Sequence, residues 1–334
     1  MKALIFDPDL TFGAVPDPVP APHQALVEVA AVALNFGEIA YRSPDPRPGD
    51  APGDPSRPAP RPAARHVPGW DAAGVVVRAA ADGSGPAAGA RVVTFGWAGA
   101  WAELRAVDTA DLAVVPDGVD LGLAAALPVA GGTAAQAVRR LGPIAGRRVL
   151  VTGASGGVGR FAVQLAARAG AHVIASVGAP ERGAGLRELG AAEIVIGPAG
   201  LRERVFGVLD NVGGRQLAEA FLRLTDDGVV QAIGKASREP TTIDFEEARV
   251  RSLRGRIENF NLETPLGADL AHLIGLLAAG ELDVPVGLRA PWDDAAEAAA
   301  SLLGRRVQGK VVLDLPRTAP DRPAQVASDR RNVT

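Results

Sequence analysis

A glycine-rich turn stands between an apolar run, Val149–Thr152, and a segment of helical period that stops at Gly170. Its glycines are Gly153, Gly156, Gly157 and Gly159. Glycine lets the backbone turn sharply and approach an anion, and the first turn of the following helix offers unpaired N–H groups. A second apolar run, Val173–Val177, completes a strand–helix–strand crossover. In that context the turn predicts a pyrophosphate site for a dinucleotide and hydride transfer, the alternative being an ordinary tight turn.

The residues after the second run bear on which dinucleotide binds. A site for NAD places Asp or Glu about 20 residues after the turn, where it accepts from the ribose 2′-OH. Here Ser176 and its neighbours are uncharged, no acid occurs until Glu181, and Arg182 follows. Arginine pairs with a 2′-phosphate that a carboxylate would repel, although Arg182 could also cap a solvated helix start. We predict NADPH as the cofactor, with Ser176 and Arg182 among its contacts.

Composition restricts the class of protein. The chain has 334 residues, a net charge of −3 and no cysteine. The length allows two domains, the charge gives no basic surface for nucleic acid, and the lack of cysteine removes disulfides and thiolate zinc sites. No apolar run reaches the ~20 residues that cross a bilayer, and the N-terminus lacks a signal-peptide layout. We therefore expect a cytoplasmic protein without nucleic-acid or membrane partners.

Residues 1–118 read as a β-rich region, because apolar runs alternate with clusters of Gly, Pro and Asp. The predicted strands are Lys2–Phe6, Ala25–Leu34, Gly74–Ala79, Arg91–Phe95 and Ala113–Val115. The stretch from Ser43 to Pro68 is rich in proline, which suits neither a helix nor a central strand. It is either a lid beside the site or a surface insertion, and the low cost of long loops favours the insertion.

A helical pattern covers Leu121–Gly142, with one helix predicted to begin at a capping Thr133. Strands and helices then alternate to about Phe245, which predicts a doubly wound parallel sheet. Its strands are Val149–Thr152, Val173–Val177, Glu193–Ile196, Val205–Asn211 and Gly228–Ile233. Beyond the sheet we predict helices over 268–280 and 293–303, a strand over 309–315 and a disordered tail after Pro316.

Seven short motifs in this layout resemble the medium-chain dehydrogenase/reductase superfamily, and within it the zinc-independent quinone oxidoreductase and enoyl reductase branch. They are the glycine turn and residues 35–38 (Asn-Phe-Gly-Glu), 68–76 (Pro-Gly-Trp-Asp-Ala-Ala-Gly-Val-Val), 127–134 (Leu-Pro-Val-Ala-Gly-Gly-Thr-Ala), 189–193 (Leu-Gly-Ala-Ala-Glu), 209–214 (Leu-Asp-Asn-Val-Gly-Gly) and 308–313 (Gln-Gly-Lys-Val-Val-Leu). The resemblance implies an α/β fold. A GroES-like β domain would comprise residues 1–118 and 256–315, a Rossmann domain with a doubly wound parallel sheet residues 119–255, and the tail residues 316–334.

The resemblance also indicates whether the chain could bind the zinc ion found in other members of the superfamily. Zinc members of the superfamily carry a Cys near Asn35 and a Gly-His-Glu where this chain has Gly69-Trp70-Asp71. Without cysteine, and with Trp70 in place of the histidine, tetrahedral zinc lacks ligands. The four histidines, His23, His66, His172 and His272, have no metal-site spacing. We therefore predict no metal, and reduction of a quinone or an α,β-unsaturated carbonyl rather than oxidation of a simple alcohol.

Further cofactor contacts are implied by the resemblance alone. It places Asn35, Asn211 and Val212 near the nicotinamide and its ribose. The pyrophosphate would be lined by Thr133, Gly156, Gly157 and Val158, and the other side of the cofactor bordered by Ile233, Gly234 and Lys235. A family tyrosine beside the NADPH phosphate aligns here with Gly197, so the phosphate contact rests on Arg182.

Hydride transfer to a carbonyl compound also needs a proton donor. Tyr41 is the only tyrosine and follows the Asn35 motif, one position away from the tyrosine of bacterial quinone reductases. A tyrosine at a domain boundary is more often a packing residue. Tyr41 and Asn35 are the predicted catalytic residues.

Three functions stay open: an NADPH-dependent quinone or enone reductase with a small hydrophobic substrate, a reductase for an enoyl thioester or natural-product intermediate, and a non-catalytic NADPH-binding protein. A thioester enzyme would need a basic groove, for which residues 42–65 offer several arginines. A homodimer is a further expectation. The β-prone stretch Pro240–Phe245 would form the sheet edge that pairs, unless a neighbouring loop covers it.

Overall fold

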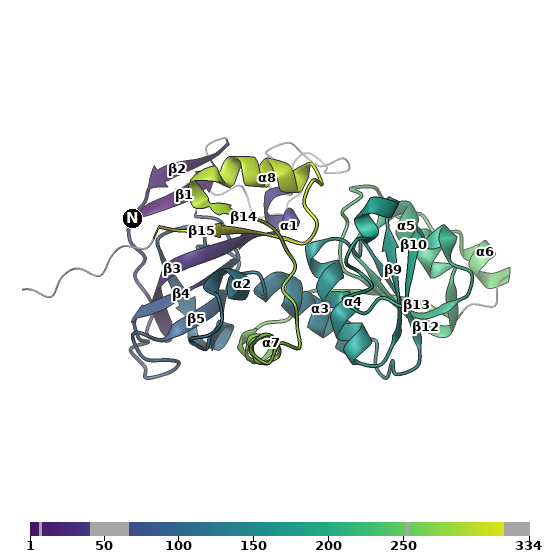
Figure 1. Ribbon diagram of the computed structural model, residues 1–334, viewed down its shortest axis with the longest axis horizontal. Helices are drawn as coiled ribbons and strands as arrows, with labels where there is room; N and C mark the ends of the chain where they lie inside the picture. Colours follow the sequence, from purple (N-terminus) through teal and green to yellow (C-terminus); the bar gives the residue numbers. More distant parts are fainter. Residues whose placement is uncertain (7–8, 41–66, 251–253, 317–334) are drawn as a thin grey trace, which may run out of the picture.

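Two large β-sheets lie at opposite ends of the molecule in the computed structural model, which describes residues 1–6, 9–40, 67–250 and 254–316 (Figure 1). One sheet has seven strands and the other six. The helices α3 (Pro128–Arg140) and α4 (Gly157–Arg168) lie where the two ends meet (Figure 1). The predicted α/β class, a β domain beside a doubly wound parallel sheet, is confirmed.

The seven-stranded sheet has the order β14-β15-β3-β4-β5-β7, and β6 also pairs with β3. Its strands are β3 (Gln24–Leu34), β4 (Asp71–Arg78), β5 (Arg91–Phe95), β6 (Leu104–Asp108), β7 (Leu112–Val114), β14 (Val286–Pro291) and β15 (Lys310–Asp314). A separate hairpin joins β1 (Lys2–Phe6) and β2 (Leu10–Ala14). The strand β6 was not predicted, because its alternation places the charged Arg105 at a buried position.

The six-stranded sheet is parallel throughout and has the order β10-β9-β8-β11-β12-β13. Its strands are β8 (Arg148–Thr152), β9 (His172–Val177), β10 (Glu193–Ile196), β11 (Val205–Asp210), β12 (Leu224–Ala232) and β13 (Arg256–Asn259). The short, polar β13 was expected in the returning part of the β domain, but it pairs with β12. The other domain boundaries stay a prediction.

The helix α3 begins five residues before the predicted Thr133 cap. Pro128 occupies its first turn, where the missing N–H of proline costs nothing, and Thr133 lies buried in mid-helix. Two glycines leave room on this helix for α7 (Gly267–Ala278): a Cβ at Gly131 would lie 3.0 Å from Leu273 Cδ1, and one at Gly132 would lie 3.2 Å from Leu266 Cδ2.

The remaining α-helices of the described residues belong to the two ends of the molecule. They are α1 (Phe36–Ala40), α2 (Leu121–Ala125), α5 (Gly214–Phe221), α6 (Phe245–Val250) and α8 (Ala295–Leu303). In the part of the chain that the structure describes, no helix is long and apolar enough to cross a membrane.

The predicted edge strand at Pro240–Phe245 is wrong. Residues 240–244 form no strand, Phe245 begins α6, and Ile243 packs against a hydrophobic cluster of the same sheet. Within the described residues the strand order instead ends at β13, so this strand is one edge of the six-stranded sheet. The tail after Pro316 and most of the proline-rich stretch lie outside the described residues.

Candidate nucleotide-binding and active site

The glycine turn joins β8 to α4, and its conformation depends on the absence of side chains. Gly153 has φ of 58°, a left-handed conformation that favours glycine. A Cβ on Gly159 would lie 2.3 Å from the carbonyl oxygen of Gly153, so only glycine lets α4 pack this closely on the turn. At Gly156 the nearest atom to a Cβ is 3.4 Å away, which leaves this side of the backbone accessible. Val158 lies half-buried in the first turn of α4.

The ends of β11 and β12 meet beside this turn. A Cβ on Gly153 would lie 3.1 Å from Val212 Cγ2, and Asn211 Nδ2 donates to the carbonyl oxygen of Thr152 over 2.9 Å. Ile233 N and Gly234 N both donate to the carbonyl oxygen of Asp210. Lys235 follows them. Five predicted contacts, Asn211, Val212, Ile233, Gly234 and Lys235, therefore lie at the carboxyl edge of the parallel sheet, where nucleotides bind in such folds.

An arginine cluster borders the turn. Arg182 Nε donates to Ser155 Oγ over 3.0 Å, and Arg182 Nη1 donates to the carbonyl oxygen of Arg305 over 2.8 Å. Arg160, on α4, donates from Nε to the carbonyl oxygen of Ser155 over 3.4 Å and from Nη2 to Gln308 Oε1 over 3.0 Å. Burial lowers the pKa of Arg160; the Asp283 carboxylate partly opposes this shift, and the nearby Arg182 charge adds to it to a smaller extent. Two guanidinium groups close together, with no carboxylate bridging them in these contacts, suit an anion.

Ser176 lies at the end of β9, directly under the turn. Its carbonyl oxygen accepts from Ala154 N over 3.1 Å, and its side chain is fully buried. Its Oγ is a buried polar atom without a hydrogen-bond partner among the described residues. The sequence predicted Ser176 and Arg182 but missed Arg160 and Arg305, which come from α4 and from the loop after α8.

A second, buried cluster forms where β3, α1, β4 and β15 meet. Asn35 Nδ2 donates to Asp71 Oδ2 over 2.9 Å and to Glu38 Oε1 over 3.3 Å. Lys310 Nζ donates to Asn35 Oδ1 over 2.6 Å and to Asp71 Oδ2 over 3.1 Å. Both amide protons of Asn35 are thus engaged, so in this arrangement Asn35 cannot also donate to a substrate oxygen.

Burial dominates the electrostatics of this cluster. The Glu38 side chain is 1% exposed, and its burial, together with the neighbouring Asp71 charge, raises its pKa to about 8. Burial likewise lowers the pKa of Arg105 to about 10. Arg105 donates to the carbonyl oxygens of Trp70, Thr94, Gly96 and Ala98 and to the Thr94 hydroxyl. It therefore holds the loops around Trp70 against β5.

Aromatic side chains stand next to the cluster. Trp70 and Trp97 pack edge to face with ring centroids 5.2 Å apart, and Phe95 packs edge to face on Trp97 at 5.0 Å. The Trp97 side chain is 54% exposed. Such a wall suits a hydrophobic or planar molecule.

One predicted site residue, the catalytic candidate Tyr41, lies outside the described residues. Thr133 lies one helical turn after Ala130, and the Cβ of Ala130 would be 3.8 Å from a Cβ on Gly157. The helix α3 therefore reaches the turn, and a cofactor contact of Thr133 stays a prediction.

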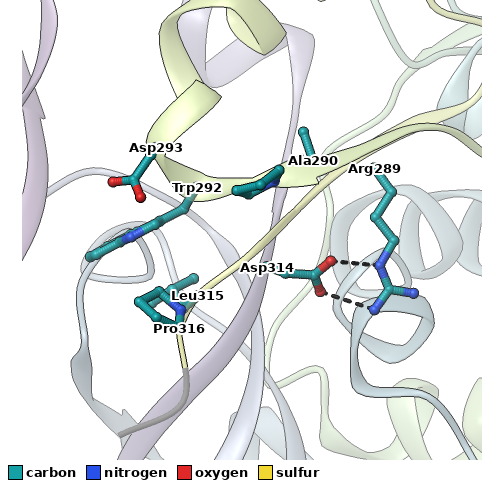
Figure 2. A pocket seen from close by; sticks show the side chains of 8 residues that line it. Arg289, Ala290, Trp292, Asp293, Asp314, Leu315 and Pro316 are labelled. Atoms are coloured by element: carbon teal, nitrogen blue, oxygen red, sulfur yellow. Dashed lines mark hydrogen bonds and ion pairs between the residues drawn. The ribbon is translucent and has the colours of Figure 1, made fainter.

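A cavity of about 330 Å³ lies elsewhere, at the opposite end of β15 from Lys310 (Figure 2). It is lined by residues of β14, β15 and the turn at Trp292, and Arg289 forms two hydrogen bonds with Asp314 on one wall (Figure 2). None of the predicted site residues lines it.

Comparison with known proteins gives two family matches. The model described as "Alcohol dehydrogenase GroES-like domain" matches residues 21–117, and the model described as "Zinc-binding dehydrogenase" matches residues 189–313. The first match confirms the predicted GroES-like character of the β-rich region.

Individual relatives extend the comparison. Over 74% of its length the chain is 38% identical to a segment of erythronolide synthase EryA2 from Saccharopolyspora erythraea, a segment that is only 7% of that synthase. It is 28% identical to a quinone oxidoreductase of Pseudomonas aeruginosa, over 88% of this chain and 92% of that protein. A mycobacterial protein solved in complex with NADPH is similar with a TM-score of 0.80 and 25% identity, over 94% of this chain and 100% of that one.

The residues present do not fit the zinc that the second family description mentions. The chain has no cysteine, and Trp70 stands beside Asp71. In the described ranges no three His, Asp or Glu side chains gather as a metal site would require. Lys310 Nζ, already a cation, lies 3.1 Å from Asp71 Oδ2. The residues around the glycine turn, by contrast, fit NADPH: they provide an accessible backbone at Gly156, the Ser176 hydroxyl and two arginines.

Proposed function

Because the chain belongs to the quinone oxidoreductase-like branch of the medium-chain dehydrogenase/reductase superfamily, we propose that it transfers a hydride from NADPH to a quinone or an α,β-unsaturated carbonyl without a metal. The superfamily assignment makes the protein an NAD(P)-dependent oxidoreductase. The preference for NADPH, the acceptor and the absence of metal are the proposed part.

The observation that carries the NADPH preference is the pair of guanidinium groups at Ser155. Arg182 and Arg160 both donate to this residue, and the first acid after β9 is the exposed Glu181. A 2′-phosphate there would gain charge-assisted hydrogen bonds, whereas the ribose hydroxyl of NADH lacks the usual carboxylate partner. The NADPH complex of the similar mycobacterial protein supports the same preference.

NADPH supplies the hydride, from C4 of its nicotinamide. The chain's own residues position and enclose the reaction. Asn35 would contact the nicotinamide side, and Trp70 and Trp97 would form a hydrophobic wall that keeps water from the acceptor. Since both amide protons of Asn35 are engaged, we assign the protonation of the product oxygen to Tyr41, the predicted catalytic tyrosine, or to solvent.

An enoyl thioester or natural-product intermediate is the second candidate acceptor. Its support is the 38% identity to a segment of a synthase. The arginines of residues 42–65, which could form a basic groove for such a substrate, lie outside the described residues. A non-catalytic NADPH-binding role is the third candidate, and it rests on the fact that we assign no proton donor among the described residues.

Consumption of NADPH by the purified chain tests these candidates. A simple quinone, an enone and an enoyl thioester are offered in parallel, with NADH as the matched cofactor, and each reaction is repeated with a chelator. We expect NADPH to be consumed with the quinone or enone at an unchanged rate under chelation. Activity that disappears with the chelator and returns with zinc would end the metal-free proposal. Binding of NADPH without consumption under any acceptor would support the non-catalytic role.

A further inference from the structure

We propose that Lys310 is a positioning residue for hydride transfer, whose buried ammonium fixes the orientation of the Asn35 amide and connects it to the glycine turn. The inference rests on the proposed function, since it assigns a role to a residue of the same site. Lys310 lies at the start of β15 and is only 3% exposed.

The three ammonium protons of Lys310 have three acceptors, at the end of β3, just after it and at the start of β4. Lys310 Nζ is 2.6 Å from Asn35 Oδ1, 3.1 Å from Asp71 Oδ2 and 3.3 Å from the carbonyl oxygen of Leu34. Asp71 is fully buried, and its second oxygen accepts from Val129 N, at the start of α3, over 3.1 Å. The ammonium therefore compensates a buried carboxylate and is held in one place.

This arrangement permits one orientation of the Asn35 amide. An ammonium can only donate, so the oxygen of the amide must face Lys310. Carboxylates, when ionised, can only accept, so the nitrogen must face Asp71, 2.9 Å away. Lys310 supplies the donor to the Asn35 oxygen, so without it only the nitrogen of the amide would be held, by Asp71 and Glu38.

The same residue contacts the nucleotide side of the site. A Cβ on Gly157 would lie 2.9 Å from Lys310 Cδ, so the lysine side chain passes directly over the first residue of α4. Gly309 N donates to the carbonyl oxygen of Ser155 over 2.9 Å, and Gly309 pairs with Gly156 in an isolated β-bridge. A shift of the glycine turn is therefore transmitted through Lys310 to Asn35.

The chemical reason for such a connection is geometric. Hydride transfer requires the nicotinamide and its acceptor to be held in register, and a displacement of about 1 Å can cost on the order of 10²-fold in rate. Lys310 links the residue expected beside the nicotinamide to the turn expected to hold the pyrophosphate. It acts through Asn35 rather than on the reacting atoms.

The test compares Lys310→Met, which keeps the side-chain length, with Lys310→Arg, which keeps the charge. Since Lys310→Met leaves Asp71 buried without a counter-charge and can prevent folding, the double variant Asp71→Asn, Lys310→Met is made as well. In this double variant the amide introduced by Asp71→Asn can donate to Asn35 Oδ1. The Asn35 side-chain amide would then rotate so that its oxygen faces position 71, and the protein can fold because neither position 71 nor position 310 carries a buried charge. Asp314→Asn, at the other end of β15, is the control for damage to the strand.

Steady-state rates with the best quinone or enone and NADPH affinity by calorimetry are the two measurements. We expect kcat of the double variant to fall on the order of 10²-fold while its NADPH dissociation constant changes by less than about threefold. Lys310→Arg, which keeps the charge, should retain part of the rate that Lys310→Met loses. The control should keep the wild-type kcat. A folded double variant with wild-type kcat overturns the positioning role and leaves the proposed function standing. A wild-type chain that consumes NADPH with none of the acceptors overturns the proposed function, and this role with it.

Discussion

Arg182 donates from Nε to the hydroxyl of Ser155 over 3.0 Å, which places a guanidinium directly against the glycine turn. The contact joins the residue that the sequence proposed for the 2′-phosphate to the residue that precedes Gly156. Through this contact an arginine six residues beyond Ser176, in a 3₁₀ turn over Pro180–Gly183, lies beside the glycine turn.

From this contact we predict a cofactor-specific loss in Arg182→Ala. Losing a charge-assisted phosphate contact should cost on the order of 1.5–3 kcal/mol in NADPH binding. The Michaelis constant for NADPH should rise accordingly, and that for NADH should stay nearly unchanged. Arg187→Ala is the matched control, because Arg187 is exposed and donates to the carbonyl oxygen of Ala192. Equal losses with both cofactors would show that Arg182 only supports the fold.

A methyl group on Gly159 should disrupt the nucleotide turn. The added Cβ would lie 2.3 Å from a backbone oxygen and 2.7 Å from Ala154 Cα, so the backbone itself must move. We expect Gly159→Ala to be destabilised by a few kcal/mol in chemical unfolding and to lose NADPH affinity in calorimetry.

The control for this variant is Gly275→Ala, on α7. Apart from its chain neighbours and the backbone of its own helix, no atom lies within 4 Å of its added Cβ, and alanine in an exposed helix is favoured over glycine by about 1 kcal/mol. Gly275→Ala should therefore be as stable as the wild type or more stable. A Gly159→Ala protein with unchanged stability and affinity would contradict the close packing of α4 on the turn.

Glu38 should make stability depend on pH. Its pKa rises from 4.5 to about 8 on folding, so between these values the folded state keeps a proton that the unfolded state has lost. The free energy of unfolding should therefore fall as pH rises through this window, by up to about 1.4 kcal/mol per pH unit from this group, and level off above it. Denaturant unfolding of wild type and Glu38→Gln over this range isolates the contribution. Parallel curves for the two proteins would contradict the raised pKa.

We now predict that the dimer forms through β13 rather than through residues 240–245. Strand β13 ends the described sheet, and Phe245 and Val250, on the preceding helix α6, are 70% and 79% exposed. An open edge beside exposed apolar residues favours pairing with a second copy of the chain. Helix α6 lies at the end of the molecule away from the seven-stranded sheet (Figure 1), so each active site would still be built within one chain.

Light scattering tests this prediction with Ile257→Lys, which places a charge on β13. We expect a wild-type dimer, a variant with a mass near one 34.1 kDa chain, and unchanged turnover per folded molecule. Val19→Lys, at a 91% exposed position of the other domain, should leave the dimer intact. A wild-type mass near one chain would falsify the proposal.

The sequence predicts well what short-range patterns determine. The β-branched runs of β8, β9 and β11 and the glycine spacing located the parallel sheet and its nucleotide turn. It predicted poorly where a polar residue is buried or a strand is short and charged. Arg105 interrupts the apolar pattern of β6, and Arg256–Asn259 did not read as a strand.

The Asn35 cluster shows a second limit of prediction from sequence, which concerns contacts between residues far apart in the chain. Asn35 was predicted at the nicotinamide, whereas Asp71 and Lys310 were noted only as parts of the separate motifs 68–76 and 308–313. The hydrogen bond between Lys310 and Asn35 joins residues 275 positions apart, and no local pattern carries such a contact. It exists because β15 inserts between β14 and β3.

That insertion imposes an order on biosynthesis. When a ribosome makes this chain, β3 and β4 emerge early, and Asp71 with them, but the strand that pairs with β3 on its open side is made after the entire six-stranded sheet. Until then the nascent β domain holds a carboxylate whose ammonium partner has not been synthesised. The cluster of Asn35, Asp71 and Lys310 is consequently among the last parts of the protein to become native. A chain truncated before Lys310 would contain most contacts of the glycine turn but not a complete cluster.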